Sequence, residues 1–190
     1  MTDPYDHLRE DQALAPLVAD YGELALEPAE DPFERLVVSI VRQQLSMASA
    51  DAIEERLFEQ FDVTPTALRD VQVEKFRDVG LSKRKGQTVR NVAVAFDEHG
   101  YDREYFAAYS DDQVLDELTE ITGIGPWTGK MFCMFALGRE DVFPVEDLGI
   151  RKGIQEIDDD DLDRDAMIDR AERWRPYRSI ASLYLWRALD

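Results

Sequence analysis

Apolar residues recur every three or four positions along most of this chain, which is the spacing of one helix face. The longest such segment, DPFERLVVSIVRQQLSMASADAIEERLFEQF, covers residues 31–61. Asp31 suits a helix cap and Pro32 a first turn, where the missing N–H of proline does no harm. The segment therefore predicts a pair of buried or half-buried helices. Its apolar positions at helical spacing include Leu36, Val37, Ile40 and Val41.

Shorter amphipathic segments follow, separated by glycines and by capping serine or aspartate residues. They read TPTALRDV, EKFRDVG, KGQTVRNVAVAFDEHG and DDQVLDELTEI, and two more, IDDDDLDRDAMIDRAERW and RPYRSIASLYLWRAL, stand near the C-terminus. We expect the four aspartates at 158–161 to form a solvated loop and helix start. Strand signals are lacking, so the pattern predicts an all-α fold.

Length and composition allow one compact domain, or two small ones that share a cleft. The chain has 190 residues, of which 44% are hydrophobic. No apolar run approaches the roughly 20 residues that span a bilayer, and the start MTDPYDHLRED is unlike a targeting peptide. We therefore expect a cytoplasmic protein with no membrane partner. The single cysteine, Cys133, lies in the apolar run MFCMFAL and is interpreted as packing; one cysteine excludes a disulfide or a four-cysteine cluster within this chain.

The charge balance is strongly acidic, with 22 Lys and Arg against 41 Asp and Glu and a formal net charge of −19. Such a surface is typical of proteins whose self-repulsion is screened by concentrated salt, so we expect a halophilic source. Residues 79–96 contain no acidic residue and hold a basic island. Taken alone, this island is best explained as a solvated helix start whose charges contact nothing. Its basic residues are Lys83, Arg84, Lys85 and Arg90.

The segment ITGIGPWTGK at residues 121–130 predicts a tight turn between two helices. Gly123 and Gly125 can adopt backbone angles closed to other residues, and Pro126 can start the next helix. The unpaired N–H groups of that helix would then point outward with a partial positive charge, as a phosphate site requires. A bare Gly-x-Gly would more simply indicate an ordinary turn with Ile124 in the core.

The fuller pattern Leu118-x-x-Ile121-x-Gly-Ile-Gly-x-x-Thr128 resembles the DNA-binding helix-hairpin-helix. With Asp147 downstream, it is similar to the helix-hairpin-helix-Gly/Pro/Asp superfamily of DNA glycosylases, and most similar to the 3-methyladenine DNA glycosylase II family. RQQLS at 42–46, and WRPYRS followed by YLW near the C-terminus, resemble further stretches of that family.

The resemblance implies a two-lobed, all-helical bundle with the active site in the cleft between the lobes. One lobe, residues 33–120, would carry the segment that wedges into DNA. Residues 1–32 together with 121–190 would form the other lobe, with the catalytic aspartate and the C-terminal helices. Both would belong to a single compact catalytic unit.

The implied activity is monofunctional excision of alkylated purines, of the 3-methyladenine and 7-methylguanine type, from duplex DNA in base excision repair. The catalytic residue would be Asp147, which also suits the N-cap of the helix LGIRKGI; Glu146 is the competing carboxylate. Relatives with lyase activity place a lysine just after the hairpin, where this chain has Trp127. Lys130 stands three residues later, so no lyase activity is expected.

The resemblance also assigns the binding residues. A flipped cationic base would meet Trp127, Met131 and Trp186, whereas Trp174 is interpreted as core and Tyr177 as intermediate. The gap in the duplex would be filled by Gln44 or by Leu45. The DNA backbone would be held by the main chain of the hairpin and by nearby cations, namely Gly123, Gly125, Thr128, Lys130, Lys83, Arg84 and Lys85.

No cofactor is required by this reading. A monovalent sodium or potassium ion at the hairpin is implied by the family, on the backbone carbonyls of Thr119, Ile121 and Gly123. The expected partner is double-stranded DNA with a damaged base, bound by a monomer. The alternatives are a mismatch or oxidised-base glycosylase on the same scaffold, a non-catalytic helix-hairpin-helix DNA-binding protein, and an acidic interaction protein with a coincidental turn.

Overall fold

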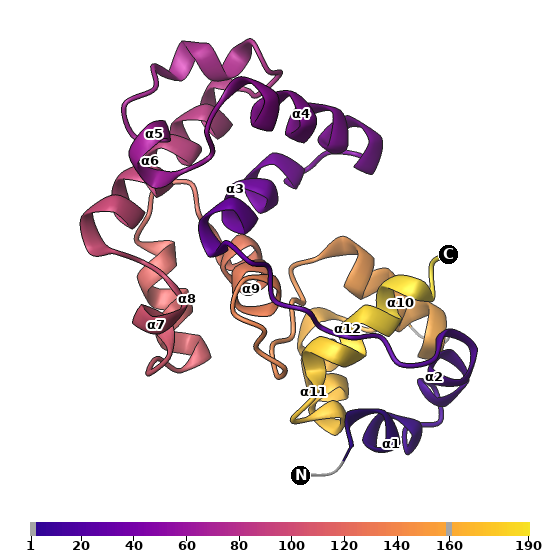
Figure 1. The fold of residues 1–190 in the computed structure, drawn as a ribbon. Coiled ribbons are helices and arrows are strands. Elements are labelled where there is room, and N and C mark those ends of the chain that lie inside the picture. Colours follow the sequence, from indigo (N-terminus) through magenta and orange to yellow (C-terminus); the bar gives the residue numbers. More distant parts are fainter. Residues whose placement is uncertain (1–2, 159–160) are drawn as a thin grey trace. The chain divides into compact units, whose positions relative to one another are not determined.

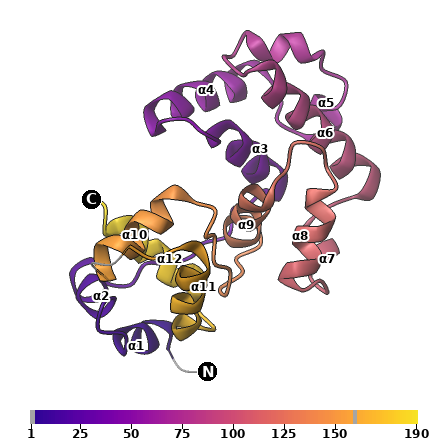
Figure 2. The ribbon, with the colours of Figure 1, turned by 180° about the vertical axis from the view of Figure 1, so that it is seen from behind.

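The computed structural model describes residues 3–158 and 161–190, and every regular element in these ranges is a helix, as the sequence predicted (Figure 1). The helices fall into two compact units, residues 1–28 with 138–190 and residues 29–137, called here the first and second unit (Figure 2). Within the described ranges, no helix combines the length and apolar character needed to cross a membrane.

The first unit contains α1 (Pro4–Arg9), α2 (Ala15–Tyr21), α10 (Leu148–Asp158), α11 (Arg164–Ala171), the short 3-10 helix η2 (Glu172–Trp174) and α12 (Arg178–Arg187). The second unit contains α3 (Pro32–Arg42), α4 (Met47–Gln60), α5 (Pro65–Leu68), the 3-10 helix η1 (Val73–Arg77), α6 (Lys83–His99), α7 (Arg103–Phe106), α8 (Asp111–Thr119) and α9 (Pro126–Phe135).

Helix α3 is the central helix of the second unit, and it starts as the sequence predicted. The carboxylate of Asp31 accepts the N–H groups of Phe33 at 2.7 Å and Glu34 at 3.1 Å, and Pro32 occupies the first turn. The helix packs against α4, α6 and α9. All its residues from Leu36 to Val41 are buried, so the helix is covered on almost every side.

The boundary between the units differs from the one expected. Residues 121–137 belong with the second unit and not with the C-terminal helices, because α9 packs against α3 and α8. Ala29 also joins the second unit, through a hydrogen bond from its N–H to the carbonyl of Phe135 at 2.8 Å. The hairpin and the RQQLS segment therefore lie in one unit.

The first unit is organised around the contact of α10 with α12. At Gly153 a Cβ atom would lie only 2.3 Å from the carbonyl oxygen of Leu185, so only glycine permits this approach. Helices α1 and α2 close the same core with Leu8, Leu14 and Val18. Trp174 and Tyr184 are fully buried in it.

A largely buried ion-pair cluster joins the turn after α1 to α10 and α11 beside this core. The Arg170 guanidinium donates to Asp11 at 2.6 Å and to Asp158 at 2.8 Å, and the Trp174 indole donates to Asp11 at 2.9 Å. Of the four aspartates at 158–161, the middle two lie outside the described residues. Asp158 is not the solvated residue expected, since its side chain is only 17% exposed and pairs with Arg170.

The pKa of Asp11 follows from this cluster. Burial opposes the charged form, but hydrogen bonds from Arg170, from the N–H of Ala13 and from Trp174 outweigh it and lower the pKa to about 2. Ionised Asp11 therefore stabilises the folded protein.

We predict that Asp11→Asn destabilises the protein by about 3 kcal/mol at neutral pH, because it leaves Arg170 short of a buried counter-charge. Since the folded pKa lies below the unfolded one, the contribution is complete above about pH 4 and is lost as pH falls towards 2. The variant should lack that acid-dependent loss. Urea denaturation at pH 7 and pH 3 measures both effects.

The matched control is Asp6→Asn, on α1 itself, where the exposed Asp6 pairs with Arg9. This change should stay within about 0.5 kcal/mol of wild type. Equal effects of the two substitutions would contradict the importance of the buried cluster.

Candidate functional site

The hairpin between α8 and α9 has the geometry that its glycines predicted. Gly123 adopts a φ of 105°, and a Cβ there would lie 2.1 Å from Thr88 Oγ1 on α6. Ile121 and Ile124 are buried beneath the turn. Gly125 precedes α9 in an extended conformation and provides no side-chain cap, with Pro126 in the first turn. The start of α9 is therefore capped by no side chain, as an anion site at a helix N-terminus requires.

The predicted residues on α9 differ in accessibility. Trp127 and Lys130 are half-buried, whereas Thr128 and Met131 are buried, with exposed fractions of 2% and 5%. The Thr128 hydroxyl accepts a hydrogen bond from Gln43 Nε2 at 2.7 Å. Thr128 thus offers only its main chain to a ligand, and the buried Met131 presents little of its side chain to the surface.

The RQQLS segment forms the turn between α3 and α4. Gln44 is exposed and has a φ of 56°, and Leu45 beside it is 40% exposed. Both wedge candidates therefore face solvent. Sequence reasoning missed Met47, which is 75% exposed at the start of α4. The sequence does mark this residue, because Met47 is an apolar residue that directly follows the helix cap Ser46.

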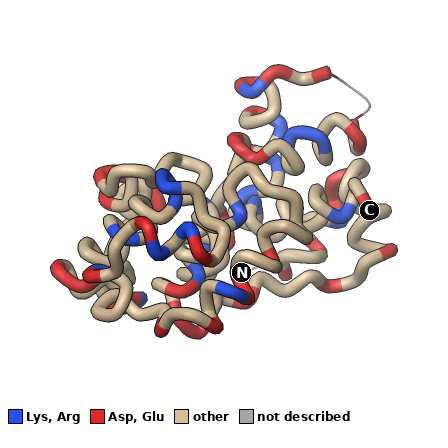
Figure 3. Tube along the Cα trace, turned by 90° about the horizontal axis from the view of Figure 1, so that it is seen from above, with Lys and Arg blue, Asp and Glu red and all other residues tan. Residues whose placement is uncertain are grey.

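The basic island divides into two parts. Lys83 and Arg84 are exposed at the start of α6. Lys85 instead donates from Nζ to the carbonyl oxygens of Val41 at 2.7 Å and Gln43 at 2.6 Å, and burial lowers its pKa. The expected phosphate contact by Lys85 is therefore not supported by its position, because the ammonium holds main-chain carbonyls. Figure 3 shows acidic positions throughout the described parts of both units.

In the first unit, Asp147 stands at the start of α10, as predicted. Its Oδ1 atom accepts the N–H of Ile150 at 3.0 Å, which is a helix-capping bond, and the indole N–H of Trp186 at 3.0 Å. Trp186 is half-buried on α12. The structure therefore brings together two predicted site residues, the carboxylate and one aromatic wall. Trp174 and Tyr177 are buried core residues, as the first of them was expected to be.

Gly149 on α10 lies against both Asp147 and Trp186. A Cβ at Gly149 would lie 2.8 Å from Trp186 Cδ1 and 2.9 Å from Asp147 Oδ1. These distances are shorter than a Cβ atom tolerates. Gly149 is a site residue that sequence reasoning did not identify, although it stands two residues after Asp147.

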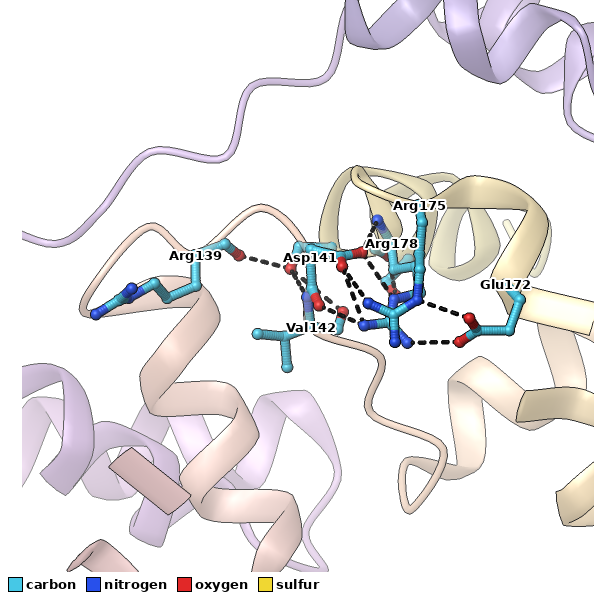
Figure 4. Close-up of polar contacts among 8 residues, drawn as sticks. Arg139, Asp141, Val142, Glu172, Arg175 and Arg178 are labelled. Carbon is cyan, nitrogen blue, oxygen red and sulfur yellow. Dashed lines mark hydrogen bonds and ion pairs between the residues drawn. The ribbon is translucent and has the colours of Figure 1, made fainter. Parts of the chain in front are cut away.

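The loop that leads to Asp147 is fixed by α12 and the segment before it (Figure 4). The Asp141 carboxylate accepts hydrogen bonds from Arg178 Nε and from Arg175 Nη1, both at 2.7 Å. Ser179 Oγ donates to the carbonyl of Arg139 at 2.6 Å and accepts the N–H of Val142 at 2.9 Å. The WRPYRS segment thus holds the loop in place.

The last residues of this loop are held by Arg151 on α10. Its guanidinium donates to the carbonyls of Val145 at 2.9 Å and Glu146 at 2.8 Å. The backbone on both sides of Asp147 is therefore anchored, because the carbonyl of Asp147 also accepts the N–H of Arg151 at 3.2 Å. An anchored backbone fixes the direction in which the carboxylate points.

We predict that Gly149→Ala disrupts the bond between Asp147 and Trp186 without unfolding the protein. The new methyl must displace the indole or the carboxylate, both side chains, while alanine's better helix propensity offsets part of the strain. Stability should change by about 1 kcal/mol, and the Trp186 indole N–H should exchange faster in NMR spectra.

Gly153→Ala provides the contrast one helical turn later, because its methyl meets the backbone of Leu185. This change should cost at least about 3 kcal/mol. An unchanged Trp186 N–H signal in Gly149→Ala would refute the proposed contact.

Comparisons with known proteins identify the family of the chain. The model of the HhH-GPD superfamily base excision DNA repair protein matches residues 37–176. The chain is 32% identical over 182 residues to DNA-3-methyladenine glycosylase 1 of Schizosaccharomyces pombe, covering 92% of this chain and 79% of that protein. It is 29% identical to Bacillus subtilis YfjP, covering 95% of this chain but only 64% of that protein.

Solved structures show the same likeness. The Schizosaccharomyces pombe 3-methyladenine DNA glycosylase Mag1 in complex with abasic DNA superposes with a TM-score of 0.89 at 29% identity, covering 98% of this chain and 96% of that one. A DNA-3-methyladenine glycosidase from Bacillus halodurans gives 0.82 at 35% identity, covering 98% and 89%. The chain therefore belongs to the HhH-GPD superfamily of base excision DNA repair proteins.

Proposed function

We propose that this protein is a DNA glycosylase that excises alkylated purines from duplex DNA. The observation that carries the proposal is the Asp147 carboxylate, fixed between the start of α10 and the indole of Trp186. A non-catalytic DNA-binding protein has no need of such a carboxylate. The relatives named above as 3-methyladenine glycosylases support the choice of alkylated bases.

The reaction needs little from the protein beyond positioning and charge. The bond between C1′ and the base nitrogen breaks, and its electron pair leaves with the base. Positive charge develops on the deoxyribose, and a fixed carboxylate beside C1′ stabilises it. A water oxygen then bonds to C1′, and Asp147 accepts the proton that this water releases. The products are the free base and an abasic site.

The leaving base calls for electron-rich walls, because alkylation at ring nitrogens makes it cationic. Trp186 is half-buried beside Asp147 in the first unit, and stacking of such a ring on a cationic base contributes on the order of 1 kcal/mol. Trp127, half-buried on α9 in the second unit, stays a prediction from the family resemblance. The indole N–H of Trp186 is held by Asp147, which fixes the orientation of that ring. One hydrogen bond thus orients both the wall and the carboxylate.

DNA binding is assigned to the second unit. The main chain at the start of α9, which no side chain caps, and the exposed Lys83 and Arg84 suit phosphate oxygens. Gln44 or Leu45 would fill the space of the extruded base. The acidic composition supports the further proposal that the protein works in a salt-rich medium, where binding that relies on few cationic side chains loses less affinity.

The hairpin also provides oxygen ligands suited to a sodium or potassium ion, namely the carbonyls of Thr119, Ile121 and Gly123. The Ile121 carbonyl accepts the N–H of Ile124 at 2.9 Å and, having two lone pairs, can still bind an ion. When bound, such an ion would add positive charge beside the phosphates.

The central experiment incubates the protein with duplexes that each carry one lesion, in high potassium salt, followed by alkaline cleavage at abasic sites. Excision of 3-methyladenine or 7-methylguanine supports the proposal. Excision restricted to oxidised or mismatched bases would replace it with the alternative substrate class on the same scaffold.

We predict that Asp147→Asn lowers the rate of excision by about 10² to 10⁴-fold. The asparagine oxygen can still accept the Ile150 and Trp186 N–H groups, so the fold and the binding of abasic-analogue DNA should survive. Single-turnover rates and binding titrations measure the two effects. Glu146→Gln, which removes the neighbouring charge, is the control and should retain excision; the reverse result would move the role to Glu146.

We also predict that the protein leaves the DNA strand intact. The position at which lyases of the superfamily attack C1′ with a lysine holds Trp127, so borohydride should trap no covalent adduct and strands should break only after alkali. A bifunctional glycosylase serves as the positive control. Formation of an adduct through Lys130 would show that this prediction is wrong.

A further inference from the structure

The turn between α3 and α4 combines exposure with an unusual backbone. Residues 44–49 are all exposed, and Gln44 is the non-glycine residue with a positive φ, 56°, in the described part of the chain. Such a conformation is uncommon for a residue with a side chain, and it persists when the surroundings determine it. In this protein, contacts with neighbouring helices of the second unit hold the turn.

Lys85 on α6 provides the first restraint. Its Nζ atom donates to the carbonyls of Val41 at 2.7 Å and Gln43 at 2.6 Å, at the end of α3. The last carbonyls of a helix lack intrahelical partners and carry partial negative charge, so an ammonium is favoured there. Burial lowers the pKa of Lys85, which is the mark of an ammonium withdrawn from solvent.

Two further restraints come from the neighbouring side chains of the same segment. Gln43 Nε2 donates to Thr128 Oγ1 on α9 at 2.7 Å. Arg42 Nη2 donates to Asp51 and Glu54 on α4, both at 2.9 Å. The chain just before Gln44 is therefore tied to three helices of the second unit, and only the residues beyond it are presented to solvent.

We infer that Lys85 is a positioning residue, which holds the turn at residues 43–46 in the conformation that presents Gln44 and Leu45, and is not a phosphate contact. An ammonium has three donors, and two of those on Lys85 are occupied by main-chain carbonyls. A phosphate could recruit them only by releasing the end of α3. A turn that is already ordered loses less conformational freedom when it enters a base stack.

The effect of Lys85 on excision rests on the proposed function. Whether Lys85 holds the turn at residues 43–46 can be tested without DNA. The variants are Lys85→Met, which removes the donors at similar length, and Gln43→Met, which removes the bond to Thr128 without changing charge. Lys75→Met is the control for loss of one positive charge, because Lys75 is exposed on η1.

Hydrogen exchange of the free proteins, followed by mass spectrometry, reports on the turn. Amides of residues 43–46 should exchange about tenfold faster in Lys85→Met and Gln43→Met than in wild type, and Lys75→Met should match wild type. Unchanged exchange in Lys85→Met would overturn the inference, whatever Gln43→Met shows. If Lys85→Met fails to fold, the milder Lys85→Gln replaces it in this measurement.

The DNA measurements separate positioning from phosphate binding. Lys85→Met should excise alkylated bases about 10 to 100-fold more slowly in single turnover, while its affinity for undamaged duplex and the salt dependence of that affinity match those of Lys75→Met. A salt slope lower by about 0.9, with unchanged exchange, would make Lys85 a phosphate contact and overturn the inference.

Excision at the wild-type rate by Lys85→Met and Gln43→Met, despite a loosened turn, would also overturn the positioning role. If the wild-type protein excises no alkylated base, the proposed function fails. The exchange data would still decide whether Lys85 holds the turn, so the two failures are distinguishable.

Discussion

The close approach of α10 to α12 is the constraint on which the candidate catalytic site depends. Gly153 lets the two helices meet at the carbonyl of Leu185, and Gly149 leaves room for the Trp186 indole against Asp147. A larger residue at either position would separate the helices or push one partner away. The hydrogen bond between the carboxylate and the indole therefore depends on the absence of a side chain at these two glycines.

In the second unit, a glycine also permits a close approach between two segments. Gly123 lets the hairpin lie against Thr88 on α6, and the same helix supplies Lys85 to the end of α3. Helix α6 therefore supports both of the surfaces assigned to DNA, the hairpin and the exposed turn. A hydrogen bond from Gln43 to Thr128 also ties that turn directly to α9, the helix that follows the hairpin. Neither surface is an independent loop.

Local signals in the sequence were sufficient for elements whose ends are set by neighbouring residues. The Asp31 cap, the hairpin glycines and the position of Asp147 at a helix start were all predicted, because each depends on residues within one helical turn. The same Asp-Pro signal at Asp3 marks α1, which was not singled out. What could not be predicted depends on distant partners. The Nζ contacts of Lys85, the placement of α9 in the second unit and the ion pair of Asp158 with Arg170 all require knowledge of tertiary neighbours.

Several arginines of this acidic protein are already committed to internal acceptors. Arg42, Arg151, Arg170 and Arg178 hold carboxylates or carbonyls within their own units. On the proposed function, these committed guanidinium groups would be less available to phosphates, and an encounter with undamaged duplex would release few counterions. The protein would then stay only briefly on each undamaged site. Its complexes with undamaged DNA would be short-lived, and a long-lived complex would form only where an extruded base is bound.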